Sequence, residues 1–133
     1  MSVSTKETDL YQAVMEGIAF EMRFNMERTR EAGLEIRELH ATGGGANSEK
    51  WLQIKADILN VPIRTMENPQ AGAIGTIILM GKALGVYKSL EEGVRRLVAY
   101  GKVFSPNPEN FVKYQKVYER YQKLYAAVRP LIT

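Results

Sequence analysis

The first part of the chain carries apolar residues at helical spacing. Such residues recur every fourth position, which predicts one long helix with an apolar stripe. The stripe consists of Leu10, Val14, Ile18, Met22 and Met26. Ser4 and Glu7 have the spacing of a capping box at its start, and Gly33 is the residue type that follows a helix end.

A glycine-rich run interrupts the pattern in the next segment. A short strand is predicted at about residues 36–41, directly before Gly43, Gly44 and Gly45. Asn47 or Ser48 can then cap a second helix, which Asn60 ends. The face that this helix should bury consists of Trp51, Ile54, Ile58 and Leu59.

The following segment predicts one more strand and two helices. The strand covers residues 62–66 and starts with a proline, where the missing N–H does least harm. A helix at about residues 71–84 ends at a glycine. Ser89 and Glu92 form a second capping box, which predicts a short helix to about residue 99.

The last segment predicts a long amphipathic helix. Pro106 and Pro108 mark a loop, and Pro130 is expected to close the helix. Its apolar seam, spaced alternately by three and four residues, is Phe111, Tyr114, Tyr118, Tyr121, Tyr125 and Val128. A seam of this kind is typical of a core or of a subunit interface.

These elements define an α/β fold with two short parallel strands and about five helices. Two strands are too few for a parallel sheet that helices cover on both faces. We therefore expect residues 1–133 to be a single partial domain, with residues 106–133 as its terminal helix and tail. The same reasoning predicts a homodimer or larger homo-oligomer through the seam or through the unpaired edge of strand 36–41.

Composition narrows the class of protein. The 133 residues are 45% hydrophobic and 25% charged, which is typical of a globular domain. The whole net charge of +3 falls in residues 109–129, which indicates a solvated basic helix face and no nucleic-acid partner. The chain has no cysteine, no apolar run of membrane-spanning length and no signal-peptide core, so we expect a cytoplasmic protein without a membrane partner.

The glycine run is the strongest chemical signal. Glycines permit a close backbone approach, and the N–H groups of the helix start that follows attract a phosphate; a tight turn without ligand is the alternative. A P-loop is excluded because Ala46 and Asn47 stand where that motif needs Lys and Ser or Thr. Gly43, Gly45 and Ser48 also spell G-x-G-x-x-S, with Glu67 about 20 residues on, which is the pattern of an NAD-binding oxidoreductase.

Other candidate groups are weaker. Gly72 and Gly75, close together in a predicted helix, indicate close packing of another helix or of a ligand. His40 is the single histidine and has no second ligand or nucleophile near it in sequence. The carboxylates Glu16, Asp57 and Glu67 are scattered, so we assign no catalytic residue and no metal ligand.

Four segments resemble, in order, motifs of the FGGY carbohydrate kinases. Residues 10–20 are similar to the family's R-A-V-x-E-G-I-A-F helix, with Gln12 in place of the usual Arg. Residues 43–57 are similar to G-G-G-A-x-S followed by W-x-Q-x-x-A-D, and residues 61–75 to the strand and E-x-x-A-x-G-A-A-x-x-A stretch. Residues 104–121 are most like the tail of the xylulose kinase branch.

The resemblance implies an actin-like ATPase fold, made of two ribonuclease H-like domains with ATP between them. This chain would be the C-terminal part of the second domain. Gly43, Gly44 and Gly45 would approach the phosphates and ribose of ATP, and Asn47 and Ser48 would border the adenine pocket. The full-length enzyme would transfer phosphate from ATP, with Mg²⁺, to a hydroxyl of a ketopentose such as xylulose.

The same resemblance places the catalytic Asp and the sugar site before the first helix of this chain. We therefore expect the chain alone to be inactive and to reach the sugar only through an upstream part. Two alternatives remain at this point: the oxidoreductase fragment described above, and a non-enzymatic module that associates with itself.

Overall fold

A long helix opens the fold. The computed structural model of the chain describes residues 5–68 and 70–132. Helix α1 (Glu7–Glu31) begins after Lys6, whose backbone N–H donates to Asp9 Oδ2 over 2.9 Å. It ends before Gly33, which has a φ of +85°, as predicted. The predicted capping serine, Ser4, lies outside the described residues.

The sheet has three strands among the described residues, where the sequence predicted two. Strand β1 (Leu39–Ala41) pairs in parallel with β2 (Ile63–Met66). Strand β3 (Tyr100–Phe104) pairs antiparallel with the other edge of β2, so the order is β1-β2-β3. The α/β class is confirmed, and the prediction of a sheet of two parallel strands alone is wrong.

Strand β3 was missed because its main determinant is not local. Gly101 interrupts the segment, and glycine is depleted in strands. The structure supplies the reason for the glycine: a Cβ atom there would lie 2.5 Å from Thr65 Oγ1. A larger residue at position 101 would therefore displace the Thr65 hydroxyl, which donates to Lys102 O in β3.

Helix α2 (Glu49–Leu59) contributes side chains to both hydrophobic clusters of the fold. One cluster lies between α1, α2 and the sheet and contains Met26, Leu52, Ala56, Leu59, Val61, Ile63 and Phe104. The other lies between α1, α2 and the last helix and contains Ala19, Phe20, Ile54, Ile58 and Tyr118. The face predicted for α2 is largely correct, since Ile54, Ile58 and Leu59 are buried.

The apolar stripe predicted for α1 is only partly buried. Met26 belongs to the core and Met22 packs against it. Leu10, Val14 and Ile18 are 46%, 63% and 50% exposed. Helical spacing identified a helix with an apolar face, but nothing in the described residues covers the first half of that face.

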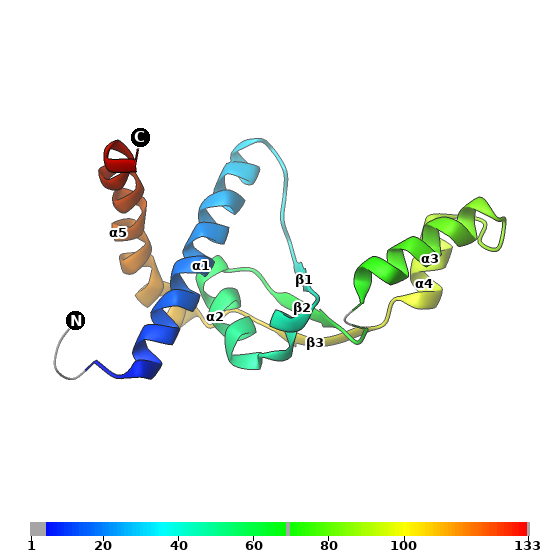
Figure 1. Cartoon of the computed structure of the whole chain (residues 1–133), viewed down its shortest axis with the longest axis horizontal. Helices are drawn as coiled ribbons and strands as arrows, with labels where there is room; N and C mark the ends of the chain where they lie inside the picture. Colours follow the sequence, from blue (N-terminus) through cyan, green and yellow to red (C-terminus); the bar gives the residue numbers. More distant parts are fainter. Residues whose placement is uncertain (1–4, 69, 133) are drawn as a thin grey trace.

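Helices α3 (Ala71–Ala83) and α4 (Leu90–Leu97) form a hairpin that extends away from the sheet (Figure 1). They pack closely through glycines, because Cβ atoms at Gly81 and Gly93 would lie 2.4 Å from Tyr87 and 2.8 Å from Ile78. Ser89 Oγ accepts the N–H of Glu92 over 3.2 Å, so the predicted helix start is confirmed.

Helix α5 (Pro108–Ile132) lies against α1 and α2. Tyr118 is 1% exposed, and its ring packs on Phe20 with a centroid distance of 5.9 Å. The central part of the predicted tyrosine seam therefore packs within the chain. The prediction that Pro130 closes the helix is wrong, because the helix continues to Ile132.

Candidate functional site

The candidate site is the glycine loop that connects β1 to α2. Gly43 has a φ of +76° and a ψ of −171°, a combination essentially restricted to glycine. Residues Gly44–Asn47 then form a short 3₁₀ helix, in which Ala46 N–H donates to Gly43 O over 3.0 Å. The backbone thus turns sharply out of the sheet and directly into α2.

The serine of the loop caps the helix. Ser48 Oγ accepts the backbone N–H of Trp51 over 3.3 Å, so Ser48 is the cap, one of the two residues predicted for it. The side chain of Asn47 is exposed beside it. The cap aligns the loop with the N-terminal end of α2, where free N–H groups and the helix dipole favour an anion.

Space around the loop is open. A Cβ atom at Gly43 or Gly44 would meet no atom within 4 Å, and one at Gly45 would only touch the Trp51 ring at 3.6 Å. Packing within the chain therefore does not require glycine at position 44. A ligand can approach the backbone closely only where no side chain stands in the way, and the glycines leave this surface open.

A second helix start faces the same edge of the sheet. Because β1 and β2 are parallel, the glycine loop and the segment that leads into α3 both leave from the carboxyl ends of strands. In α3, Gly72 and Gly75 have no atom within 4 Å of an added Cβ. The close helix packing that these two glycines indicated does not occur within the described residues, and their surface is open.

Charges near the loop are few and mostly compensated. Lys102 Nζ in β3 lies 2.8 Å from Glu49 Oε1 in the first turn of α2. The Lys55 ammonium lies 4.7 Å from the Trp51 ring centroid, and burial lowers its pKa below the ordinary value. Lys50, exposed beside the loop, makes no ion pair within the described residues.

The other polar candidates have structural roles. Asp57 is 3% exposed and accepts hydrogen bonds from Gln53 and from two groups at the start of α5. His40 Nε2 lies 2.9 Å from Glu38 Oε1, at the sheet. Nowhere in residues 5–68 and 70–132 do three His, Cys, Asp or Glu side chains gather in a way that could hold a metal ion.

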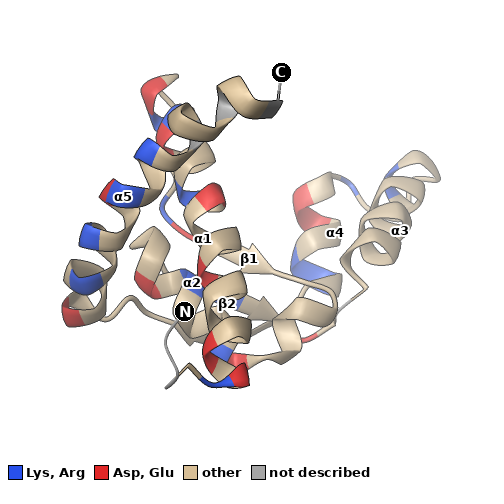
Figure 2. Cartoon of the chain, turned by 60° about the vertical axis from the view of Figure 1, so that its left-hand side comes forward, with Lys and Arg blue, Asp and Glu red and all other residues tan. Residues whose placement is uncertain are grey.

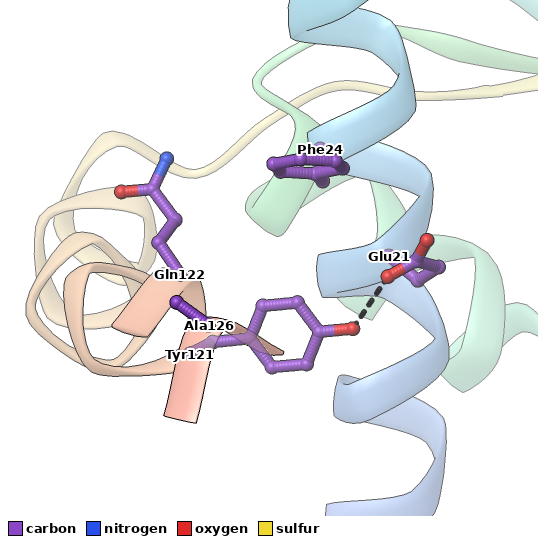
Figure 3. A pocket seen from close by; sticks show the side chains of 5 residues that line it. All are labelled: Glu21, Phe24, Tyr121, Gln122 and Ala126. Atoms are coloured by element: carbon purple, nitrogen blue, oxygen red, sulfur yellow. Dashed lines mark hydrogen bonds between the residues drawn. The ribbon is translucent and has the colours of Figure 1, made fainter. Parts of the chain in front are cut away.

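A separate cavity lies between α1 and α5. It has a volume of about 290 Å³, and Figure 3 shows Tyr121 donating to Glu21 at its side. Its lining consists of Glu21, Phe24, Tyr121, Gln122 and Ala126. None of these residues belongs to the glycine loop, and sequence reasoning had assigned Tyr121 only to the seam. No helix in the described part of the chain has both the length and the apolar character needed to cross a bilayer.

Known proteins similar to this chain share its sequence and its fold. Residues 1–84 match the model of the C-terminal domain of the FGGY family of carbohydrate kinases. The chain is 34% identical over 125 residues to a xylulose kinase of Staphylococcus epidermidis, covering 94% of this chain and 25% of that protein. It is 34% identical over 131 residues to a ribulokinase of Bacillus licheniformis, covering 94% of this chain and 24% of that protein.

A solved structure gives the same result in three dimensions. The ligand-bound xylulose kinase of Lactobacillus acidophilus superposes with a TM-score of 0.86 at 29% identity, over 97% of this chain and 26% of that one. The chain thus spans about a quarter of the length of these relatives. On the strength of the family match and these similarities, the chain belongs to the FGGY family of carbohydrate kinases and carries sequence of their C-terminal domain.

Proposed function

We propose that this chain is the nucleotide-binding part of an ATP-dependent kinase that phosphorylates a hydroxyl of a ketopentose such as xylulose. The observation that carries the proposal is the open glycine loop, held between β1 and the N-terminal end of α2. Backbone N–H groups and a helix dipole directed at open space suit a phosphate chain. The relatives compared above are named for two different sugars, so the proposal extends to the ketopentose class and no further.

In this proposal, different residues of the loop contact different parts of the nucleotide. The backbone of Gly43, Gly44 and Gly45 approaches the phosphates and ribose, because no side chain holds the ligand away. Asn47 and Ser48 border the adenine pocket. Of these two, Asn47 has the freer polar group, because Ser48 Oγ already accepts from the backbone of α2.

The rest of the catalytic machinery lies outside these residues in the proposal. Mg²⁺ neutralises phosphate charge in phosphoryl transfer, but the described residues offer no cluster of carboxylates or histidines to hold it. We therefore propose that residues 1–133 form one partial domain, the C-terminal part of the second kinase domain, with 106–133 as its terminal helix and tail. Alone it binds nucleotide without transferring phosphate, and it contacts sugar only through another part of the enzyme.

The family match disfavours the oxidoreductase alternative. Gly43, Gly45 and Ser48 do match the spacing of a dinucleotide turn, but the family to which the chain belongs consists of kinases. Glu67, which would hold the ribose of NAD, is exposed after β2, and its backbone N–H donates to Ala99 O over 3.0 Å.

Calorimetric titration of the chain with ATP and with NAD tests the proposal. The informative variant is Gly44→Leu, because a Cβ atom at position 44 meets no atom of the folded chain within 4 Å and the added side chain would obstruct a ligand. We expect ATP to bind more tightly than NAD, and Gly44→Leu to weaken ATP binding about tenfold or more without changing the melting temperature. Equal ATP binding by the variant, or tighter binding of NAD, would contradict the proposal.

A further inference from the structure

A groove runs between α1 and α5 on the side away from the sheet-bound face of α1. It consists of two hollows of about 510 and 470 Å³, which both include Glu16 and Val117. The first hollow is lined by Ala13, Glu16, Gly17, Phe20, Val117, Arg120, Tyr121 and Leu124. Because the hollows share residues, they form one continuous groove.

The first hollow of the groove is mostly apolar. The second is more polar, and Glu16, which lines both, accepts hydrogen bonds from Gln12 and Tyr114. Phe20 and Tyr121 pack on each other at the base of the groove, with ring centroids 5.5 Å apart. On α5, Val117 and Leu124 are 44% and 56% exposed along its edge. On α1, Gly17 keeps the wall low, since an added Cβ there meets nothing within 4 Å.

The α5 rim of the groove is basic. Four cations follow one another at spacings of three, four and three residues, so they form a single stripe along the helix. These are Lys113, Lys116, Arg120 and Lys123. All four are exposed, and none makes an ion pair within the described residues; the blue segments along α5 in Figure 2 mark this helix as rich in cations.

The shape of the groove fits a helix. Residues 110 to 124 of α5 border it, and at 1.5 Å per residue this is about 21 Å, or about four helical turns. An amphipathic helix can place its apolar face in such a groove. Glutamates or aspartates beside that face would then meet the exposed cations of α5.

We propose that this groove binds an acidic amphipathic helix that does not belong to residues 1–133. The unpaired basic stripe selects the occupant, because a carboxylate-bearing helix neutralises it. A second copy of the chain fits less well: a twofold contact across the groove would bring two basic stripes together. The proposal does not depend on nucleotide binding at the glycine loop.

The test uses a fluorescein-labelled synthetic peptide, held helical by a side-chain lactam. It carries leucine along one face, glutamate beside that face and alanine elsewhere, and its control has the same composition in scrambled order. Fluorescence anisotropy with the full chain measures the affinity. We expect the patterned peptide to bind about tenfold or more tightly than the scrambled one, since only it aligns leucines with the groove.

Gly17→Leu is the blocking variant. A Cβ atom at position 17 meets no atom of the folded chain within 4 Å, so a leucine there can extend into the groove. Leucine also has a higher helix propensity than glycine. We expect peptide binding to fall about tenfold or more while the melting temperature stays the same or rises. Gly44→Leu, at the glycine loop, is the matched control and should leave peptide binding unchanged.

Arg120→Glu tests the charge. It reverses a cation of the groove rim, and Lys50→Glu makes the same change in net charge at an exposed residue outside the groove. We expect Arg120→Glu to weaken peptide binding more than Lys50→Glu does. Equal effects of these two variants, equal binding of the scrambled peptide, or unchanged binding by Gly17→Leu would each overturn the proposal. A dimer that Gly17→Leu dissociates in sedimentation would instead make a second copy the occupant and would also overturn it.

Discussion

At the scale of single residues, Glu38 links the two parallel strands. It lies directly before β1, and its carboxylate accepts two hydrogen bonds of 3.0 Å from the Arg64 guanidinium in β2. His40 adds a contact of 2.9 Å to the same carboxylate. The hydrogen bonds from Arg64 first, and then that of His40, lower the pKa of Glu38 from an ordinary 4.5 to about 2.

The first prediction concerns the pH dependence that follows from this shift. Because the folded pKa of Glu38 is depressed, its contribution to stability is complete above pH 4.5 and is lost as the pH falls toward about 2. Glu38→Gln should therefore lower the free energy of unfolding at neutral pH and flatten its decline in acid. Urea unfolding at a series of pH values measures both effects.

Glu35→Gln is the control for this prediction, since it removes the same charge from an exposed pair with Arg37. It should change stability little, as exposed ion pairs contribute about 0–1 kcal/mol. If the two variants behave alike across the acid range, the pairing of Glu38 with Arg64 is not what couples these strands.

At the scale of elements, Asp57 joins α2 to the start of α5. Its Oδ1 accepts the backbone N–H of Asn107 over 2.8 Å, and its Oδ2 accepts Asn110 Nδ2 over 2.8 Å. Gln53, one turn earlier on α2, donates to Oδ1 over 2.7 Å and also to Ser105 O. A buried carboxylate thus holds the loop before α5 in place.

The second prediction is that Asp57→Ala destabilises the chain by about 3 kcal/mol, because three donors lose one buried, charged acceptor together. Gln53→Ala, which removes a single donor to the same carboxylate, should cost only about 1 kcal/mol. Thermal and urea unfolding provide the two values. A cost for Asp57→Ala as small as that for Gln53→Ala would mean that α5 is anchored by its tyrosines alone.

The same elements show what the sequence could predict. The C-terminal ends of helices at Gly33 and Asn60 and the start of a helix at Ser89 were predictable because their signals are local. The first two residues adopt a positive φ, and the third is a side-chain cap. The glycine loop was found for the same reason. Strand β3 was not, because its pairing with β2 depends on residues far apart in sequence.

Burial was harder to predict than helicity. The period of α1 identified its apolar face but not which half of that face the chain covers, since that depends on α2 and α5. In the same way, the tyrosines of α5 were equally consistent with a core or a subunit interface. Their hydroxyl partners on α1, such as Glu27 for Tyr118 at 2.7 Å, appear only in three dimensions.

At the scale of the whole molecule, the described residues leave the outer edge of the sheet and the first half of α1 without cover. The outer edge of β1 has no partner strand within the described residues. The first half of α1 exposes Leu10, Val14 and Ile18, which share one face of the helix because they are spaced four residues apart. Unpaired strand edges and apolar patches of this kind favour association.

The last prediction is that the isolated chain forms a homodimer or larger homo-oligomer through these surfaces. The predicted tyrosine seam is not the contact, because its central tyrosines, Tyr114, Tyr118 and Tyr121, pack on α1. Val14→Glu should dissociate the assembly, because burying an unpaired carboxylate at the contact costs several kcal/mol. Val112→Glu is the matched control, since Val112 on α5 is 60% exposed and Val14 is 63% exposed. Sedimentation velocity over a wide concentration range separates the outcomes. A chain that stays monomeric throughout, or that both substitutions dissociate equally, would show that the exposed face of α1 tolerates water and is not the surface through which the chain associates.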